Sequence, residues 1–457
     1  MIARPRFMIA AAHKSSGKTV ISTGLASAFH HAGDDIGTFK KGPDYIDPMW
    51  LGAASGSPCY NLDFNAMQRE CLTPFFQSRA RGLSLIEANK GLYDGVQVDG
   101  SDSNAELAKL LDLPVILVID TLGMTRGIAP LLLGYQGFDR DVTIGGVILN
   151  KVGGARHESK LRQAVETYTD LPVVGSVWRD PALEIGERHL GLTTPAELSR
   201  KDALIAGFGD VVARSVDLDL VRAIAGDAPD MAEKEIIESA PAKVETGLRI
   251  GVIRDAAFGF YYPDDLEAFE KSGADLVFID AIDDAHLPDL DGLFIGGGFP
   301  EVRMQELSAN ASLRAEIKSA LQGGLPCYAE CGGLMYLCDS LSWQGETCAM
   351  VGAIPGAAVM HTRPQGRGYA RFSNSQAHPW GQVGTVVRAH EFHYASIDGL
   401  PANMGYARDM QRGFGIDGGR DGIVTGNTVA GFCHLRNSAE FPWVPHFLEF
   451  ISRCRDV

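Results

Sequence analysis

The alternation of short apolar runs with amphipathic stretches is the feature that most restricts the fold of this chain. In the first half, apolar runs at 6–12, 113–120, 142–152 and 171–178 are separated by segments with a helical pattern, such as 156–170. Short apolar runs of this kind are typical of buried parallel strands, and their alternation with helices is typical of a doubly wound sheet. We therefore predict an α/β fold for this half.

The same pattern begins again after a stretch that has little strand character. Residues 216–247 are rich in Ala, Asp and Glu, and the next apolar run starts at residue 248. The chain has 457 residues, which is long for one domain, so two domains of about 200 residues each are expected. We predict two α/β domains, residues 1–242 and 247–457, with the boundary near Thr246.

A phosphate-binding loop is predicted at the start of the chain. The sequence HKSSGKT follows the first apolar run and leads into an amphipathic helix that ends near Gly33. Backbone N–H groups at such a helix start cradle phosphates, the lysine of the motif (Lys18) reaches the outer phosphates, and the hydroxyl of Thr19 ligates Mg²⁺. The usual first glycine of the motif is replaced by Ala12, but the strand–loop–helix setting makes a chance match a weak alternative.

Four acidic residues lie at positions where an α/β sheet keeps its chemistry. Glu87 ends an apolar run and Asp94 follows seven residues later, while Asp44 and Asp47 lie in a loop rich in Gly and Pro. Carboxylates at the carboxyl ends of parallel strands are candidates for Mg²⁺ binding. For Asp44 and Asp47 the alternative is a turn in which each acid hydrogen-bonds its own backbone.

The second half contains a candidate nucleophile, Cys331. An apolar run at 325–329 meets this cysteine, two glycines and the helix-like 334–337. A sharp turn from strand to helix lifts the side chain at the turn out of the sheet, and backbone N–H groups at the helix start can hold an oxyanion. The alternative is a buried structural cysteine beside a loop.

Two further features of the second half fit a thiol enzyme. His434 follows an apolar run near the end of the chain, and an imidazole beside a thiol takes its proton. The glycine triplet 296–298 would allow a close backbone approach to an oxyanion, although a tight turn explains it equally well. His390 and His393 lie on either side of Glu391, and a structural pair is favoured there over a substrate wall.

Composition excludes several classes of protein. The formal net charge of −16 argues against a general binder of nucleic acid or of anionic membranes. The eight cysteines are scattered without a CxxC pair, which fits reduced thiols in the cytoplasm better than disulfides or a zinc site. No apolar run approaches the roughly 20 residues that span a bilayer, and the N-terminus lacks a signal-peptide pattern.

Taken together, these motifs resemble one family, the glutamine-hydrolysing cobyrinate a,c-diamide synthases. Members join a dethiobiotin-synthetase-like ATP domain to a class I glutamine amidotransferase domain, and the likeness covers nearly the whole chain. The resemblance rests on SSGKT (15–19), FKKGPDYIDP (39–48), EANKGLYDG (87–95), GGGFPE (296–301), AECGGLMYL (329–337), HEFHYAS (390–396) and His434.

The resemblance implies a role for each matching residue. Cys331 would be the glutaminase nucleophile and His434 its base. The resemblance also implies Mg²⁺, ATP and L-glutamine as cofactor and co-substrates, and a tetrapyrrole as the substrate, with a homodimer as the candidate assembly. The other implied residues are Gly298 and Gly332 as oxyanion donors; Ser16, Gly17, Lys18 and Thr19 for ATP; Thr19, Asp47 and Glu87 for Mg²⁺; and Asp44, Tyr45 and Asp94 for the substrate and its acyl-phosphate.

The chain departs from the family pattern at two positions of the amidotransferase half, and one of them is Ala329, where many relatives have glycine. At the other, class I amidotransferases usually carry a glutamate two residues after the base, and Arg436 stands there instead. The sequence therefore predicts no third triad member at this place.

Three other functions remain open from the sequence. The NKGLYDG and HLRN segments resemble enzymes that amidate sirohaem-type tetrapyrroles, which makes these rings the alternative substrate. A small carboxylic acid is a further alternative. A regulatory P-loop ATPase with an inactive amidotransferase domain is the rival from another class, and the intact Cys331 and His434 argue against it.

Overall fold

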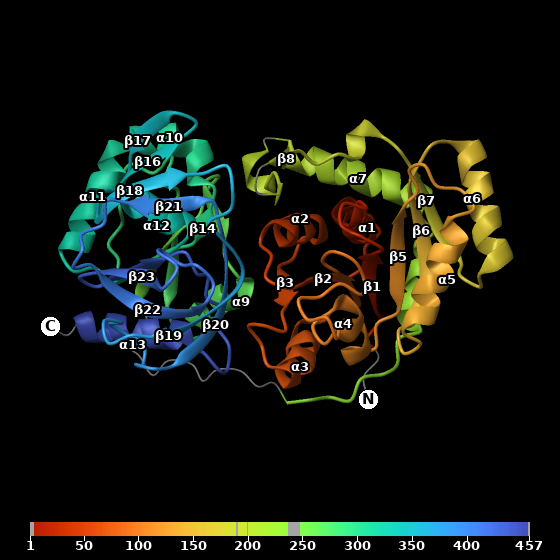
Figure 1. The fold of residues 1–457 in the computed structure, drawn as a ribbon, viewed down its shortest axis with the longest axis horizontal. Coiled ribbons are helices and arrows are strands. Elements are labelled where there is room, and N and C mark those ends of the chain that lie inside the picture. Colours follow the sequence, from red (N-terminus) through yellow and green to blue (C-terminus); the bar gives the residue numbers. More distant parts are fainter. Residues whose placement is uncertain (1–3, 189–190, 199, 236–246, 456–457) are drawn as a thin grey trace. The chain divides into compact units, whose positions relative to one another are not determined.

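A computed structural model of the protein divides the chain into two compact units, residues 1–237 and 238–457. The boundary predicted between residues 242 and 247 lies outside the described residues, so it remains a prediction. Figure 1 shows the elements of both units. The structure describes residues 4–188, 191–198, 200–235 and 247–455.

The first unit is built on a seven-stranded sheet in which every pair of neighbouring strands is parallel. The strand order is β3-β2-β4-β1-β5-β6-β7, so β1 lies near the centre. The strands are β1 (Arg6–Ala11), β2 (Ile36–Lys41), β3 (Cys59–Leu62), β4 (Leu83–Glu87), β5 (Val115–Asp120), β6 (Ile144–Val152) and β7 (Val173–Trp178).

Helices pack on both faces of this sheet. Alternate residues of a strand point to opposite faces, so each strand contributes side chains to two cores. In β1, Phe7 and Ile9 belong to the core under α1, α2, α7 and α8, whereas Met8 and Ala10 belong to the core under α3 to α6. The sheet is therefore doubly wound, as the sequence predicts. The helices are α1 (Lys18–His31), α2 (Ile46–Ser55), α3 (Arg69–Arg79), α4 (Asn104–Leu110), α5 (Ile128–Phe138), α6 (Ala155–Tyr168), α7 (Lys201–Ser215) and α8 (Leu218–Gly226), with a hairpin of β8 (Glu187–Arg188) and β9 (Gly191–Leu192) before α7.

The second unit contains a nine-stranded sheet of order β12-β10-β13-β15-β24-β23-β22-β19-β20. The strands from β12 to β24 are parallel, and those from β24 to β20 are antiparallel. The sequence pattern predicts the parallel part, but the antiparallel extension is not evident from it. The strands are β10 (Arg249–Ile253), β12 (Asp275–Ile279), β13 (Gly292–Ile295), β15 (Cys327–Glu330), β19 (Gly366–Asn374), β20 (Val386–His393), β22 (Gly405–Arg412), β23 (Arg420–Thr425) and β24 (Thr428–Gly431).

The described residues of this unit also form two smaller sheets and five α-helices. One sheet pairs β11 with β14, and the other has the order β17-β16-β18-β21. Their strands are β11 (Phe258–Phe260), β14 (Gly297–Gly298), β16 (Cys338–Trp343), β17 (Glu346–Ala349), β18 (Ile354–Met360) and β21 (Ala395–Asp398), and the helices are α9 (Pro263–Lys271), α10 (Met304–Ala309), α11 (Ala311–Gln322), α12 (Gly332–Leu337) and α13 (Trp443–Arg455).

Strand β15 is buried on both faces. Cys327 and Ala329 pack in the core shared with α11 and α12, while Tyr328 packs in the core formed with α9 and α13. Because β15 is the fourth of the nine strands in the sheet order and lies between β13 and β24, the turn at its carboxyl end is surrounded by protein. This is the turn that carries Cys331.

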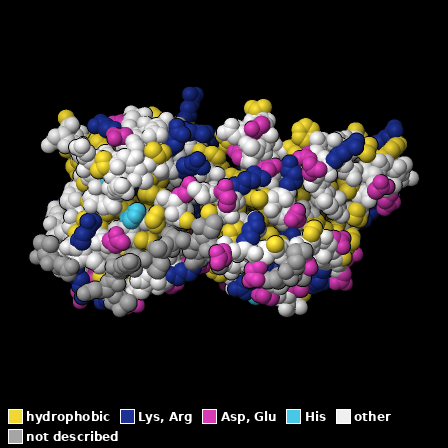
Figure 2. All heavy atoms as spheres, turned by 90° about the horizontal axis from the view of Figure 1, so that it is seen from below, with side chains coloured by type: hydrophobic (Ala, Val, Ile, Leu, Met, Phe, Trp, Pro, Cys, Tyr) yellow, Lys and Arg dark blue, Asp and Glu magenta, His cyan; other side chains and the backbone are white. Residues whose placement is uncertain are grey.

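The face of the molecule drawn in Figure 2 is mixed in character. Figure 2 shows basic and acidic side chains interspersed over the visible face, with hydrophobic side chains scattered among them. Within the described residues, no helix combines the length and apolar character needed to cross a membrane.

Candidate active site

The candidate phosphate-binding loop lies between β1 and α1. Gly17 has the left-handed φ of 88°, and a Cβ there would lie 2.3 Å from the Asn150 Nδ2 atom at the end of β6. Glycine is therefore required at this turn on two grounds. Ser16 is fully buried and its hydroxyl donates to the His13 carbonyl. The loop is thus packed against Asn150 at Gly17 and closed internally by the Ser16–His13 hydrogen bond.

Lys18 and Thr19, the side chains expected to bind phosphate and Mg²⁺, contact the neighbouring strand β4 and the loop that follows it. Lys18 Nζ donates to the Lys90 carbonyl oxygen at 2.5 Å, and Thr19 Oγ1 donates to Glu87 Oε1 at 3.2 Å. Burial and the nearby Lys40 lower the pKa of Lys18 to about 8. Lys18 therefore lies among other charged groups rather than in open solvent.

The predicted metal ligands converge on Lys40, a buried residue of β2 to which the sequence reasoning assigned no role. Its Nζ atom lies 2.5 Å from Asp47 Oδ2 and 2.5 Å from Glu87 Oε1. A lysine inside a sheet needs such partners, because an unpaired buried charge is costly. A lysine in the buried strand 36–41, followed by several acids, was the signal that could have revealed this cluster.

Asp44 takes the turn-forming role that the sequence offered as one alternative, and its second carboxylate oxygen faces Lys40. Its Oδ1 atom accepts from the backbone N–H groups of Ile46 and Asp47 at the start of α2, which is the turn-forming role. Its Oδ2 atom lies 3.8 Å from Lys40 Nζ. Burial and the neighbouring Asp47 raise the pKa of Asp44 to about 7. Tyr45 lies between the two acids and is mostly buried.

Asp94 contacts the backbone of the turn after β4. Its Oδ2 atom accepts from the Gly91 backbone N–H at 2.9 Å, which closes the turn after β4. Its negative charge opposes, without reversing, the lowering of the Lys18 pKa by burial and Lys40. The structure therefore brings Thr19, Asp47 and Glu87 together with Lys40, and leaves Asp94 on the side of the loop that Lys18 contacts.

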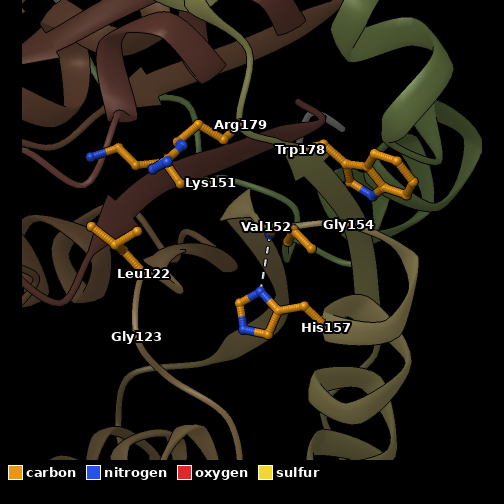
Figure 3. Close-up of a pocket in the computed structure, with 9 residues that line it drawn as sticks. Leu122, Gly123, Lys151, Val152, Gly154, His157, Trp178 and Arg179 are labelled. Atoms are coloured by element: carbon orange, nitrogen blue, oxygen red, sulfur yellow. Dashed lines mark hydrogen bonds between the residues drawn. The ribbon is translucent and has the colours of Figure 1, made fainter.

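A pocket of about 420 Å³ opens beside the phosphate-binding loop. It lies at the carboxyl ends of β5, β6 and β7, where Leu122, Lys151, His157 and Trp178 line it (Figure 3). Lys151 Nζ lies 2.7 Å from Asp120 Oδ2 and also donates to the Ser15 carbonyl. Lys151 therefore connects the pocket with the loop, and the pocket volume is in the range of small-ligand sites.

In the second unit, Cys331 lies at the predicted turn between β15 and α12. Its backbone has φ 47° and ψ −100°, outside the regions that L-residues usually occupy. Its N–H group donates to the Gly431 carbonyl at 2.7 Å, so the turn is fixed to β24. Such a strained turn is typical of a nucleophile presented between a strand and a helix.

His434 reaches the thiol of Cys331. The two side chains are within hydrogen-bonding reach, and both are buried. Burial lowers the pKa of His434, but hydrogen bonds and charges from Cys331 and Glu330 outweigh it and raise the value to about 10. The imidazole is therefore disposed to hold a proton taken from the thiol.

The two glycines predicted as oxyanion donors lie side by side. A Cβ on Gly332 would be 3.0 Å from the Gly298 backbone nitrogen, and a Cβ on Gly298 would be 1.9 Å from the Ala257 carbonyl oxygen. Only glycine fits such a close approach of two backbones. Next to them, a Cβ on Gly297 would be 2.6 Å from His434 Cε1.

The two histidines of 390–396 take structural positions. The His390 ring stacks on the His434 ring with centroids 4.9 Å apart, and the two backbones pair. The His393 ring stacks on Phe432 at 3.7 Å, and Glu391 accepts from the backbone N–H groups of Phe414 and Gly415.

A residue next to the cysteine also enters the site, and the sequence reasoning missed it. Glu330 Oε2 lies 3.2 Å from His434 Nδ1, and both side chains are only 3% exposed. Its position directly before the candidate nucleophile, at the end of a buried strand, was a signal that could have been used. A glutamate buried at such a point needs hydrogen-bond partners.

Comparisons with known proteins agree with this arrangement. Residues 7–192 match a family model described as a CobQ/CobB/MinD/ParA nucleotide binding domain, and residues 249–440 match a CobB/CobQ-like glutamine amidotransferase domain. Proteins named cobyrinate a,c-diamide synthase are similar along nearly their whole length. That of Magnetococcus marinus is 40% identical over 98% of this chain and 97% of its own, that of Methanosarcina acetivorans 38% over 95% and 93%, and that of Archaeoglobus fulgidus 39% over 94% and 94%.

Proposed function

The chain belongs to the family of cobyrinate a,c-diamide synthases, and on that premise we propose that it amidates the a and c acetate carboxylates of cobyrinate with ATP and glutamine. The observation that carries this proposal is the contact between Cys331 and His434, beside a glycine cradle, in a chain that also holds a phosphate-binding loop. The sirohaem alternative has no support from the relatives, which are named for cobyrinate.

The amidotransferase unit supplies ammonia. In this proposal the Cys331 thiol gives its proton to His434, and the thiolate attacks the side-chain carbonyl carbon of glutamine. Backbone N–H groups of Gly298 and Gly332 hold the oxyanion, and the imidazolium returns the proton to the leaving ammonia. Water then hydrolyses the γ-glutamyl thioester to glutamate and free Cys331.

The ATP unit activates the carboxylate. An acetate oxygen attacks the γ-phosphorus of ATP, ADP leaves, and the resulting acyl-phosphate is attacked by ammonia, which expels phosphate and leaves the amide. Lys18 would offset the charge of the transferring group. The pocket lined by Lys151, His157 and Trp178 suits the nucleobase, because it adjoins the loop that would hold the phosphates.

The residues around Lys40 fit a Mg²⁺ ion. Thr19, Asp47 and Glu87 offer oxygen ligands, which Mg²⁺ prefers, and Glu87 Oε2 is buried without a hydrogen-bond partner. When bound, the ion would neutralise charge on the phosphates. The lysine keeps the carboxylates gathered in this arrangement.

The acids at the end of β2 and after β4 are proposed to face the reacting carboxylate. Asp44, with its raised pKa, can approach a carboxylate without the full repulsion between two anions. Tyr45 and Asp94 would complete this wall. Propionate arms are one methylene longer than acetate arms, and near-attack geometry tolerates little misplacement, so we expect only acetates to react.

Product analysis tests this function. The full chain is incubated with Mg²⁺, ATP and glutamine, and with cobyrinate, hydrogenobyrinate, sirohydrochlorin or a small dicarboxylic acid, and products are identified by mass spectrometry. We expect a diamide of the corrinoid acid as the product with the highest kcat/KM. A higher kcat/KM for sirohydrochlorin, an amide on a propionate arm, or four or more amides would refute the assignment.

A further inference from the structure

The position where class I amidotransferases usually carry the third triad acid is occupied by Arg436, and the structure shows what this arginine does. Its Nε atom donates to Asp264 Oδ2 at 3.0 Å, and both side chains are buried. The guanidinium also lies over the Tyr262 ring at 5.0 Å. Arg436 therefore forms an ion pair with α9 and offers no carboxylate to His434.

A carboxylate reaches His434 from another direction. Glu330 is the last residue of β15, next to Cys331, and its Oε2 atom lies 3.2 Å from His434 Nδ1. The other oxygen, Oε1, accepts from the Leu435 backbone N–H at 2.7 Å. The Glu330 carboxyl group thus hydrogen-bonds both the His434 imidazole and the backbone N–H group of Leu435.

A buried hydrogen-bond chain fixes this carboxyl group. Tyr328 donates its hydroxyl to Glu330 Oε1 at 2.6 Å, and Arg408 donates to the Tyr328 oxygen at 3.0 Å. Burial raises the pKa of Tyr328 well above its usual value, so its hydroxyl remains a donor. Arg408 is itself paired with Asp421 at 2.9 Å. These hydrogen bonds fix the orientation of the Glu330 carboxyl group toward His434.

We propose that Glu330 is the positioning acid of the glutaminase site, supplied by the strand that carries the nucleophile instead of by the segment after the base. The inference rests on the proposed roles of Cys331 and His434. With Nδ1–H donated to Glu330, the Nε2 atom of His434 is the nitrogen available to the thiol. The carboxylate also stabilises the imidazolium that forms when the thiol loses its proton.

The other titratable groups around His434 do not replace this charge. His390, stacked on it from β20, has a pKa lowered well below the usual value by burial and by the charge of His434. Arg436 is paired with Asp264, and Asp265 has a pKa raised well above the usual range by burial and by Asp264. Arg408 is engaged with Asp421 and Tyr328.

The test compares the pH dependence of glutamine hydrolysis in four full-length proteins. They are the wild type, Glu330→Gln, Glu330→Asp and, as a matched control that removes another buried carboxylate, Asp264→Asn. The basic limb of kcat/KM reports loss of the imidazolium proton as the pH rises. Since Glu330 contributes to the raised pKa of His434, its neutralisation should move this limb to lower pH.

We expect Glu330→Gln to lower kcat by about 10²- to 10⁴-fold with KM for glutamine changed only a few-fold. Its basic limb should shift down by a pH unit or more, and Glu330→Asp should restore part of the shift because it keeps the charge. The Asp264→Asn limb should coincide with that of the wild type. Should the Gln variant not fold, the comparison of the Asp variant with the wild type and with Asp264→Asn decides.

Three results would overturn the inference. One is a basic limb in Glu330→Gln that coincides with the wild type, whatever its rate. Another is an Asp variant no closer to the wild type than the Gln variant, and the third is an equal shift in Asp264→Asn. Glutamine hydrolysis retained in Cys331→Ala or His434→Ala would instead refute the proposed function, so the two failures are distinguishable.

Discussion

The backbone of Cys331 provides a quantitative test of how the nucleophile is presented. Its φ of 47° and ψ of −100° place a residue with a Cβ in a region that costs about 1–3 kcal/mol. Cys331→Ala keeps the Cβ and therefore keeps the strain, whereas Cys331→Gly removes it. Both variants lose the thiol, so the difference in their stability reports the cost of the backbone conformation at position 331.

The expected difference follows from two opposing contributions. Glycine normally destabilises a folded chain by about 0.5–1 kcal/mol relative to alanine, because it loses more conformational freedom. Relief of about 1–3 kcal/mol of strain at Cys331 exceeds this cost. We therefore expect Cys331→Gly to be more stable than Cys331→Ala by about 1 kcal/mol, the reverse of the usual order.

Hydrogen exchange measured by mass spectrometry on peptides from β15 reports the opening of this unit separately from the ATP unit. A difference of about 1 kcal/mol corresponds to roughly fivefold slower exchange in Cys331→Gly than in Cys331→Ala. The pair Cys327→Ala and Cys327→Gly, in the same buried strand, is the control and should show the usual order. Faster exchange in Cys331→Gly than in Cys331→Ala would refute the claim that the turn is strained.

Three further substitutions separate the two half-reactions. Lys18→Ala should reduce amidation from glutamine and from ammonium salt alike by at least about 10²-fold, since it removes a charge that stabilises phosphoryl transfer; amidation from ammonium at the wild-type rate would contradict this. Glu87→Gln should act similarly and require more Mg²⁺ for half-maximal rate, and an unchanged Mg²⁺ titration would exclude Glu87 as a ligand. Gly332→Ala places a Cβ 3.0 Å from the Gly298 nitrogen, so glutaminase kcat should fall about 10- to 100-fold while amidation from ammonium persists; an unchanged glutaminase kcat would argue against this oxyanion cradle.

The sequence predicts the parallel parts of both sheets well, for a physical reason. Buried parallel strands read as apolar runs, and the run at 6–12 becomes β1, fully buried at the centre of its sheet. The loop at Lys18 and the turn at Cys331 are also predictable, because glycines and a strand–helix junction constrain the backbone locally. The strands, the loop and the turn are all determined by residues that are close together in the sequence.

Features that depend on distant contacts are not predictable in this way. Glu330 meets His434 across 104 positions of the chain, and Lys40 meets Glu87 across 47. The sequence pattern shows that Arg436 replaces the usual acid, but not that Asp264 pairs with it 172 residues away. The antiparallel strands β19, β20, β22 and β23 are similarly hard to predict, because half-buried strands with many polar residues resemble loops in the sequence.

Nitrogen-source dependence in Cys331→Ala tests whether glutamine hydrolysis and amidation take place at two separate sites. The variant is supplied with Mg²⁺, ATP and cobyrinate, and with either glutamine or ammonium chloride, and the products are weighed by mass spectrometry. The two-site account predicts no amide from glutamine and the a,c-diamide from ammonium at a rate near that of the wild type, since the ATP unit is untouched. Amide formation from glutamine, or loss of amidation from ammonium in a folded variant, would contradict it.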